Sequence, residues 1–273
     1  MSTRVNAYLA RLAELPASSE TRLWLDSSPR VVGRFMRCQL SSAFQPIFDT
    51  ATHRNIAREA FARSVHHQAE AQLSPWSLFA SAASDDDLIA LDRLCRTVHC
   101  LNHFAGDNAD EALFLNVHDR LLAAVVDNHG RAFRRVLDSL EIGAGQIVIE
   151  TPEAVCLNRA LLGFVVANYR LNGFQISISV ARPSELAEVL ATVRPDFIKL
   201  DARRVLREEE IETVLAQCGE QGVRPIFQRV ETDAQLARLS AAGVPLLQGV
   251  LLGEPAAPAL NLNTTGQSAD SVA

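Results

Sequence analysis

The sequence lacks the paired cysteines of a disulfide framework or a zinc site. It contains five cysteines, an odd number, and no two of them are separated by two residues. Regular cysteine pairs are typical of small secreted scaffolds and of structural zinc sites. We therefore expect the cysteines to be reduced and to lie in a hydrophobic core.

Long apolar runs and excess positive charge are also missing. No stretch approaches the roughly 18 apolar residues of a membrane-spanning helix, and residues 1–20 lack the apolar centre of a signal peptide. The formal net charge is −6 and the pI is about 5.7, which argues against binding of nucleic acid through its phosphates. These absences predict a cytoplasmic protein with neither a membrane nor a nucleic acid as its partner.

What the chain does contain is a regular alternation of strand and helix patterns. Hydrophobic residues make up 48% of the sequence, enough for a sizeable core. Strand and helix alternate about seven times over roughly 215 residues, which indicates βαβ units and a parallel sheet. The length favours an α/β fold of the (β/α)8 barrel type over an open sheet. The predicted strands are residues 43–50, 56–64, 112–117, 146–150, 174–180, 196–200 and 224–230. Of the helices between them, one covers residues 153–173, and Thr232 is predicted to cap the last.

The two ends of the chain differ from this pattern. We predict an N-terminal helical appendage (1–40), a barrel (41–256) and a disordered tail (257–273), because the tail is small and polar. Val5, Leu9, Leu12 and Leu15 follow helical spacing. Two interpretations stay open for them: a helix docked on the barrel, or a frayed first turn of the domain.

In a barrel of this kind, functional side chains lie at the carboxyl ends of the strands. Any one polar residue there is more often part of a solvated rim or a turn, but several together favour a site. The residues at these positions are Glu59, Asn116, 150–153, Ser179, Lys199, Asp201, Gln228 and Gln248.

Motifs at these strand ends resemble those of the EAL domain, a family of cyclic di-GMP phosphodiesterases with a modified (β/α)8 barrel. The similarity runs from about residue 43 to residue 255, in the family's order and spacing. The segments that carry it are AFQPIFD (43–49), REAFAR (58–63), LSP (73–75), ALD (90–92), LFLNV (113–117), IVIETPEA (147–154), PDFIKLD (195–201) and LLQG (246–249).

The resemblance implies a site with two divalent cations, usually Mg²⁺ or Mn²⁺, held mainly by carboxylates. On this alignment Glu59, Asn116 and Lys199 are retained, and Glu153 stands at a metal-binding glutamate. Two consecutive aspartates of the family are replaced by Ser179 and Val180.

A third metal-binding carboxylate of the family is replaced by Gln228. A small shift of the alignment would not restore the aspartates, because there is none between Asp138 and Asp196. We therefore expect no bound metal, no other cofactor and no catalytic residues.

The nucleotide-contacting positions are better retained than the metal positions. The resemblance implies that Gln45, Arg63, Asn116 and Gln248 surround a bound dinucleotide. The first hypothesis is therefore a catalytically inactive, metal-independent effector of cyclic di-GMP. Its predicted ligand-binding residues are Gln45, Glu59, Arg63, Asn116, Glu153, Lys199, Arg229 and Gln248.

Two arginines replace glycines of the family motifs, Arg182 after one strand and Arg229 after another. One interpretation is that one or both supply the positive charge that the cations would have supplied. The alternative is that Arg229 closes the pocket by pairing with Glu59 or Glu153, and that Arg182 lies on an exposed loop.

Other functions stay open at this point. The chain could be a ligand-free protein-interaction module that regulates a transcription or motility partner, and a homodimer is compatible with the resemblance. The third alternative is a residual phosphodiesterase. The sequence does not identify the partner or the oligomeric state.

Overall fold

The computed structural model describes residues 3–14, 22–28, 30–66, 72–105, 110–124, 130–205 and 207–258. Within these residues, none of the helices combines the length and the apolar character needed to cross a lipid bilayer. The cysteines in this part of the chain are unpaired, and all except the partly buried Cys156 are buried, as the sequence predicts.

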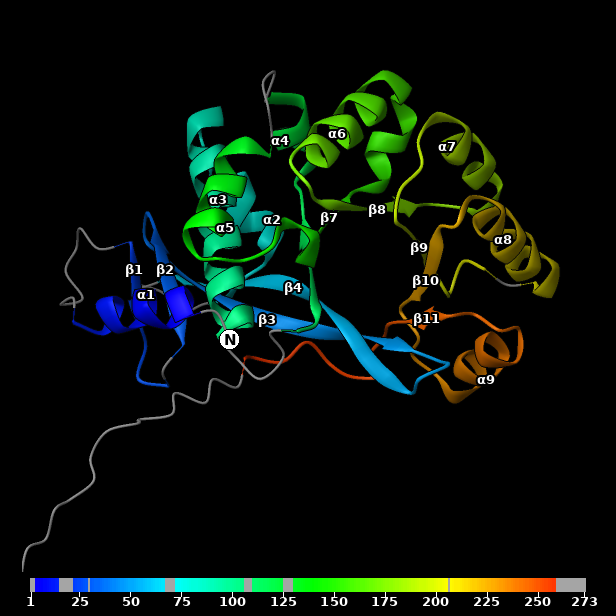
Figure 1. Cartoon of the computed structure of the whole chain (residues 1–273), viewed down its shortest axis with the longest axis horizontal. Coiled ribbons are helices and arrows are strands. Elements are labelled where there is room, and N and C mark those ends of the chain that lie inside the picture. The colour runs from blue at the N-terminus through cyan, green and yellow to red at the C-terminus, as the bar shows by residue number, and fades with distance from the viewer. Residues whose placement is uncertain are drawn as a thin grey trace, which may run out of the picture.

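Eight strands close into a barrel, which confirms the predicted α/β fold (Figure 1). β3 runs antiparallel to both of its neighbours, β4 and β11, whereas the other neighbouring strands of the barrel pair in parallel. The reversed strand is what makes this a modified (β/α)8 barrel. The strands, in order around the barrel, are β3 (Cys38–Asp49), β11 (Leu246–Leu247), β10 (Arg224–Gln228), β9 (Phe197–Asp201), β8 (Gln175–Val180), β7 (Ile147–Thr151), β6 (Ala112–Asn116) and β4 (Arg54–His66).

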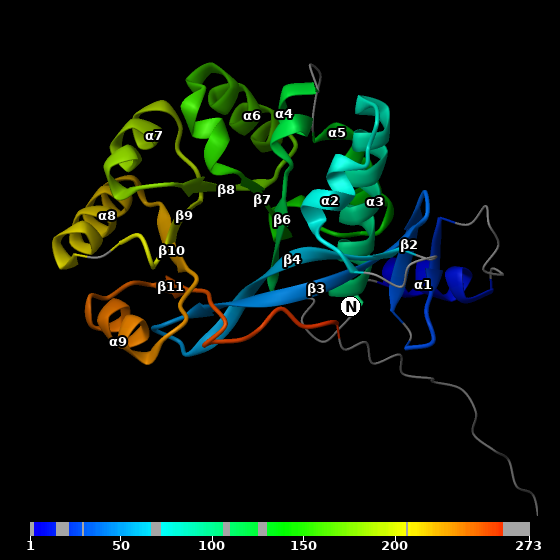
Figure 2. The ribbon, with the colours of Figure 1, turned by 180° about the vertical axis from the view of Figure 1, so that it is seen from behind.

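Helices cover the outside of this barrel (Figure 2). They begin where the sequence supplies capping side chains: Ser84 caps α3, Asn158 caps α6, and Thr232 caps α9 as predicted. The helices are α2 (Pro75–Ala80), α3 (Asp85–Phe104), α4 (Asp119–Ala124), α5 (Arg131–Ser139), α6 (Arg159–Leu171), α7 (Leu186–Thr192), α8 (Glu208–Gln221) and α9 (Asp233–Ala241). Three short 3₁₀ segments join them to strands: η1 (Ala144–Gln146), η2 (Glu153–Leu157) and η3 (Pro183–Glu185).

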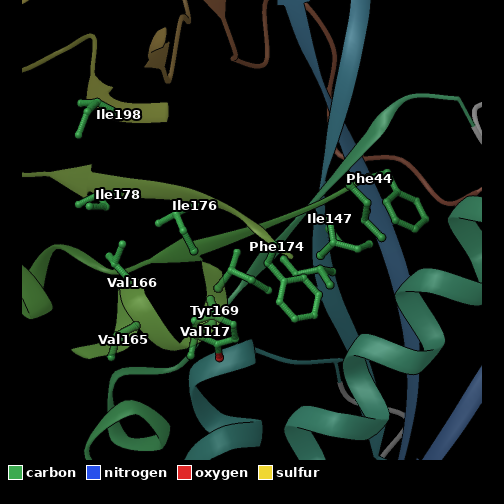
Figure 3. Close-up of a cluster of buried hydrophobic side chains, with 14 of the residues drawn as sticks. Phe44, Val117, Ile147, Val165, Val166, Tyr169, Phe174, Ile176, Ile178 and Ile198 are labelled. Carbon is green, nitrogen blue, oxygen red and sulfur yellow. The ribbon is translucent and has the colours of Figure 1, made fainter. Parts of the chain in front are cut away.

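The outward side chains of the strands and the inward side chains of the helices form the main core. Figure 3 shows Ile176 and Ile178 of β8 in one cluster with Val165, Val166 and Tyr169 of α6. All five are at most 5% exposed. Burial of such apolar side chains is the principal driving force that holds the helical layer on the barrel.

The inside of the barrel has a second, smaller apolar core at one level. Because side chains alternate along a strand, the residue two positions further on points inward at the next level. The apolar level consists of Ile47, Ala57, Phe114, Val148, Phe197, Ile226 and Leu246. The adjacent inward level consists of Gln45, Glu59, Asn116, Glu150, Lys199, Gln228 and Gln248. The barrel therefore has an apolar floor beneath a polar layer.

The N-terminal residues form a helix and two strands. α1 (Thr3–Glu14) buries Val5, Leu9 and Leu12, so the docked helix is correct and the frayed turn is not. β1 (Leu23–Leu25) and β2 (Val31–Phe35), which the sequence analysis did not predict, extend the sheet from β3. A further short strand, β5 (Gln72–Leu73), pairs with β4. Leu15 and most of the predicted disordered tail, 259–273, lie outside the described residues.

One predicted helix differs in the structure. Residues 153–173 were expected to be continuous, but η2 ends at Leu157 and α6 begins at Arg159. The Asn158 side chain accepts a hydrogen bond from the Leu161 amide and so starts a new helix. The break leaves Glu153 in a short 3₁₀ turn just beyond β7, where it lines the cavity described below.

Candidate functional site

The polar layer of the barrel is organised around Lys199. Its Nζ lies 2.6 Å from Oε2 of Glu59 and 2.6 Å from Oε2 of Glu150. β4, β7 and β9 supply these three side chains, each two residues beyond an apolar residue of the barrel floor. One ammonium group therefore bridges two carboxylates in the middle of the barrel.

Lys199 is the only lysine in the chain, whose other 25 positive side chains are arginines. It is fully buried, and its Nζ lies 5.2 Å from the centre of the Phe114 ring beneath it. Burying a cation is costly unless it is paired and hydrogen-bonded. The two glutamates, which are 5% exposed, provide that pairing.

Side-chain donors complete the hydrogen bonding of the two carboxylates. Glu59 accepts from Asn116 Nδ2 at 2.7 Å and from Gln248 Nε2 at 2.8 Å, and Glu150 accepts from Ser179 Oγ at 3.2 Å. With Lys199, every carboxylate oxygen of the pair has a donor. The cluster is a satisfied network.

Within the part of the chain that the structure describes, one buried acceptor beside this network has no hydrogen-bond partner. Gln248 donates through Nε2 to Glu59 and to Gln45, which leaves its buried Oε1 without a hydrogen bond. The predicted site residues Gln45 and Gln248 both line the cavity above the cluster.

The three ionisable groups shift each other's pKa. Burial raises the pKa of Glu150 to about 7, and the charge of Glu59 adds to this effect. Burial alone would also raise the pKa of Glu59, but Lys199 and the hydrogen bonds to this carboxylate outweigh it and lower the pKa. For Lys199, burial favours a lower pKa, and the two carboxylates reverse that into an increase. At neutral pH Glu59 is therefore ionised and Lys199 is protonated, whereas the carboxyl group of Glu150 titrates near pH 7.

A cavity of about 840 Å³ opens above this cluster. Its volume is within the range of about 300–1,000 Å³ found for small-molecule sites. Its polar and charged lining residues include Gln45, Glu59, Asp92, Arg96, His99, Asn116, His118, Glu150, Glu153, Ser179, Arg204, Gln228, Arg229 and Gln248. The aromatic side chains of Phe61 and Phe79 also line it, and Phe79 stacks on His118 with ring centres 5.0 Å apart.

Arginines surround a buried carboxylate at the rim of this cavity. Asp201, 4% exposed, lies 2.9 Å from Arg203 Nη2, 3.5 Å from Arg229 Nη1 and 3.8 Å from Arg204 Nε. Arg229 therefore does not close the pocket by pairing with Glu59 or Glu153. Arg203 and Arg204 lie just beyond the end of β9, and the sequence did not indicate them because they stand at no motif position.

The structure changes the predicted role of Glu153. The resemblance placed Glu153 at a metal-binding glutamate, but in the structure it is Glu150 that lies beside Glu59 at Lys199. Glu153 is in η2 at the rim, and its carboxylate accepts from Arg204 Nη1 at 3.1 and 3.2 Å. The two-residue alternation from Val148 in the barrel floor is the signal that identifies Glu150 as the inward side chain.

The three positions where the family's other carboxylates were expected differ in orientation. Ser179 points inward to Glu150, and Gln228 lines the cavity. Val180 is 1% exposed and belongs to the main core outside the barrel. Among the described residues, no group of three or more histidine, cysteine, aspartate or glutamate side chains has the geometry to hold a metal ion.

Two other predicted arginines lie away from the cavity. Arg63 is exposed and lines a separate cavity of about 310 Å³ between the N-terminal strands and the segment near Pro255. The prediction that Arg63 surrounds a ligand with Gln248 is therefore not met by this arrangement. Arg182 has a side chain 76% exposed and lies 3.4 Å from Glu185, in agreement with the exposed-loop interpretation.

Comparison with known proteins identifies the barrel. A family model described as the EAL domain matches residues 31–255. Solved structures with a similar fold include BlrP1 of Klebsiella pneumoniae in complex with calcium and cyclic di-GMP, at 22% identity and a TM-score of 0.67. YkuI of Bacillus subtilis, an EAL-domain protein in complex with cyclic di-GMP and calcium, has 19% identity and the same TM-score. Each comparison covers 81% of this chain and 56% of the other chain.

A further structure of Klebsiella pneumoniae BlrP1 contains FMN and cyclic di-GMP and no metal ions. It has 23% identity to this chain and a TM-score of 0.62, and the match covers 81% of this chain and 54% of that one. The present chain thus spans just over half the length of these neighbours. The comparison with curated proteins found no match.

Proposed function

Because the chain belongs to the EAL domain family, we propose that it is a catalytically inactive member that binds cyclic di-GMP without metal ions. The proposal has two parts. The first is that the barrel does not assemble the two-metal centre of a phosphodiesterase. The second is that the cavity above Lys199 still accepts the dinucleotide and that binding serves as a signal.

The observation that carries the first part is the Lys199 bridge between Glu59 and Glu150. Two divalent ions bring four positive charges, and this cluster offers two carboxylates against one ammonium. At a separation of about 4 Å and an effective dielectric of about 20, two unit charges interact by about 4 kcal/mol. Each positive charge without a carboxylate partner therefore disfavours metal binding by an amount of this order. In the family, further carboxylates offset the lysine. Here Ser179 and Gln228 are uncharged and Val180 faces the other way.

The hydrogen bonding of the carboxylates supports the same conclusion. The four oxygens of Glu59 and Glu150 accept from Asn116, Gln248, Ser179 and Lys199. A metal ion would have to displace these donors while gaining few charged ligands. Hard cations such as Mg²⁺ and Mn²⁺ prefer several oxygen ligands, mostly carboxylates.

The second part rests on the cavity. Its volume of about 840 Å³ suits a nucleotide ligand, and the amide side chains of Gln45, Asn116 and Gln248 are among its lining residues. Arg204 and Arg229 bring positive charge to a rim that lies next to the polar layer. A similar barrel with bound cyclic di-GMP and no metal ions is a precedent for such binding within the fold.

Isothermal titration with cyclic di-GMP tests this proposal. We expect micromolar binding with the same affinity in EDTA and in Mn²⁺, and no linear product after incubation with Mn²⁺. Binding that requires Mn²⁺, together with hydrolysis that is lost in Glu59→Gln, would show a residual phosphodiesterase instead. Absence of heat in both buffers would favour the ligand-free interaction module. A pull-down would then test this module, and a partner retained by Gln248→Ala would support it.

A further inference from the structure

Three arginines gather around one buried carboxylate at the rim of the cavity. Asp201 is a single buried carboxylate, yet three arginines contact it within 3.8 Å. Arg203 binds it most closely, through Nη2 at 2.9 Å and Nε at 3.1 Å, and also contacts Glu231 on the outside. Arg203 therefore makes the close contacts with Asp201, whereas Arg229 reaches it only at 3.5 Å and Arg204 pairs mainly with Glu153.

Those two arginines face the cavity. Arg204 and Arg229 both line it, together with Ser179, Gln228 and Glu150, whereas Arg203 does not line it. Their side chains are 49% and 55% exposed, so each guanidinium is accessible from the cavity mouth. They come from different elements: Arg204 follows β9 and Arg229 follows β10. Two guanidinium groups thus converge beside the positions where the family's missing carboxylates would lie.

The backbone at Arg229 is strained. Its φ is +63°, in the left-handed region where a glycine fits without cost and a larger side chain does not. Strained residues persist where the surrounding structure fixes them, and they gather at functional sites. An arginine in this conformation destabilises the fold relative to glycine, which is consistent with a role of its guanidinium group in binding.

Arg204 is held by a carboxylate that an anion can replace. Its Nη1 lies between the two carboxylate oxygens of Glu153, which is 40% exposed, at 3.1 and 3.2 Å. Ion pairs of this exposure contribute little. A phosphate that receives the planar fork of an arginine forms a stronger, charge-assisted pair. Glu153 is therefore a competitor that occupies Arg204 in the absence of ligand.

We propose that Arg204 and Arg229 form a phosphodiester-binding subsite that replaces the divalent cations of the family, with Asp201 as a positioning residue and Glu153 as its internal competitor. This inference rests on the proposed function, because it names the groups that would bind the phosphates of cyclic di-GMP. It depends on the arginines alone and does not require the Lys199 cluster to act on the ligand.

Calorimetric titration of variants with cyclic di-GMP in EDTA tests the subsite. We expect Arg204→Gln and Arg229→Gly each to weaken binding by about 10- to 100-fold, the effect of losing a charge-assisted hydrogen bond. Arg229→Gly keeps the left-handed backbone and should raise Tm by about 2–4 °C while it weakens binding. A purely structural role of Arg229 would not raise Tm while weakening the binding of cyclic di-GMP.

Glu153→Gln should tighten the binding of cyclic di-GMP several-fold, because Arg204 loses its competing carboxylate. The exposed control Arg182→Gln should leave the affinity within twofold of the wild type.

The outcomes separate this inference from the proposed function. If the wild-type chain binds cyclic di-GMP and both arginine variants bind within twofold of it, the subsite is wrong and the effector proposal stands. If the wild-type chain does not bind the dinucleotide, the effector proposal fails, and inorganic pyrophosphate becomes the probe. A rise in Tm with pyrophosphate that is lost in Arg204→Gln and Arg229→Gly supports the subsite. An equal rise in all variants, or none in the wild-type chain, overturns it.

Discussion

Replacing Lys199 with methionine should lower the free energy of unfolding by about 3–5 kcal/mol at pH 8, the cost of breaking a buried ion pair from one side. Methionine is similar in length and lacks the charge, so the change isolates the ammonium. It leaves Glu59 and Glu150 facing each other, with no cation between them, inside the barrel. Chemical denaturation with urea measures the loss.

Two further variants serve as controls for Lys199→Met. Adding Glu150→Gln to Lys199→Met should recover part of the lost stability, because one of the two repelling charges disappears. Arg58→Met, which removes a partly exposed pair with Glu111, should cost at most about 1 kcal/mol. A Lys199→Met protein as stable as the wild type would mean that the ammonium does not bridge the two carboxylates.

The second large effect is a pH dependence that Glu150→Gln should remove. The pKa of Glu150 is about 7 in the folded chain, above the value of about 4.3 for an exposed glutamate. The folded state therefore binds the extra proton, and stability falls as pH rises from about 4.5 through about 7. The wild type should lose on the order of 3 kcal/mol across this window relative to Glu150→Gln.

The comparison with the variant is needed because other buried groups titrate as well. The pKa values of His99 and His103 are lowered to about 3 and about 4 by burial, so their contribution to stability increases with pH up to about 6.5. This trend opposes that of Glu150, but it is the same in both proteins and cancels in the difference. Urea unfolding at pH 5, 6, 7 and 8 gives that difference. A constant difference between the two proteins would contradict the raised pKa.

The sequence predicted the architecture well because the barrel depends on regular features. The apolar strands and the Thr232 cap of the last helix follow from local periodicity and capping chemistry. The expectation that functional side chains lie at the carboxyl ends of the strands selected Glu59, Asn116, Lys199 and Gln248, and in the structure each stands two residues beyond an apolar floor position. A period of two is therefore informative about the site as well as the fold.

The structure differs from the expectations at residues that were placed by motif similarity alone. Glu153 matched a family glutamate, but β7 ends at Thr151, and the turn that follows places Glu153 at the rim. Arg63 matched a motif, yet it lies beside the separate cavity near the N-terminal strands. Arg204 could not be found in the sequence, because its contact with Glu153 joins segments about 50 residues apart only after folding.

The most direct test of the central claim uses the single lysine of this chain. With ¹³C-labelled lysine, Lys199 gives one side-chain signal, and a paramagnetic Mn²⁺ ion bound by Glu59 or Glu150 would broaden it beyond detection. We predict that this signal persists through a titration with Mn²⁺ and that dialysis finds no bound metal. Loss of the signal as two equivalents of Mn²⁺ bind would show that the barrel holds the two-metal centre, and would contradict the account.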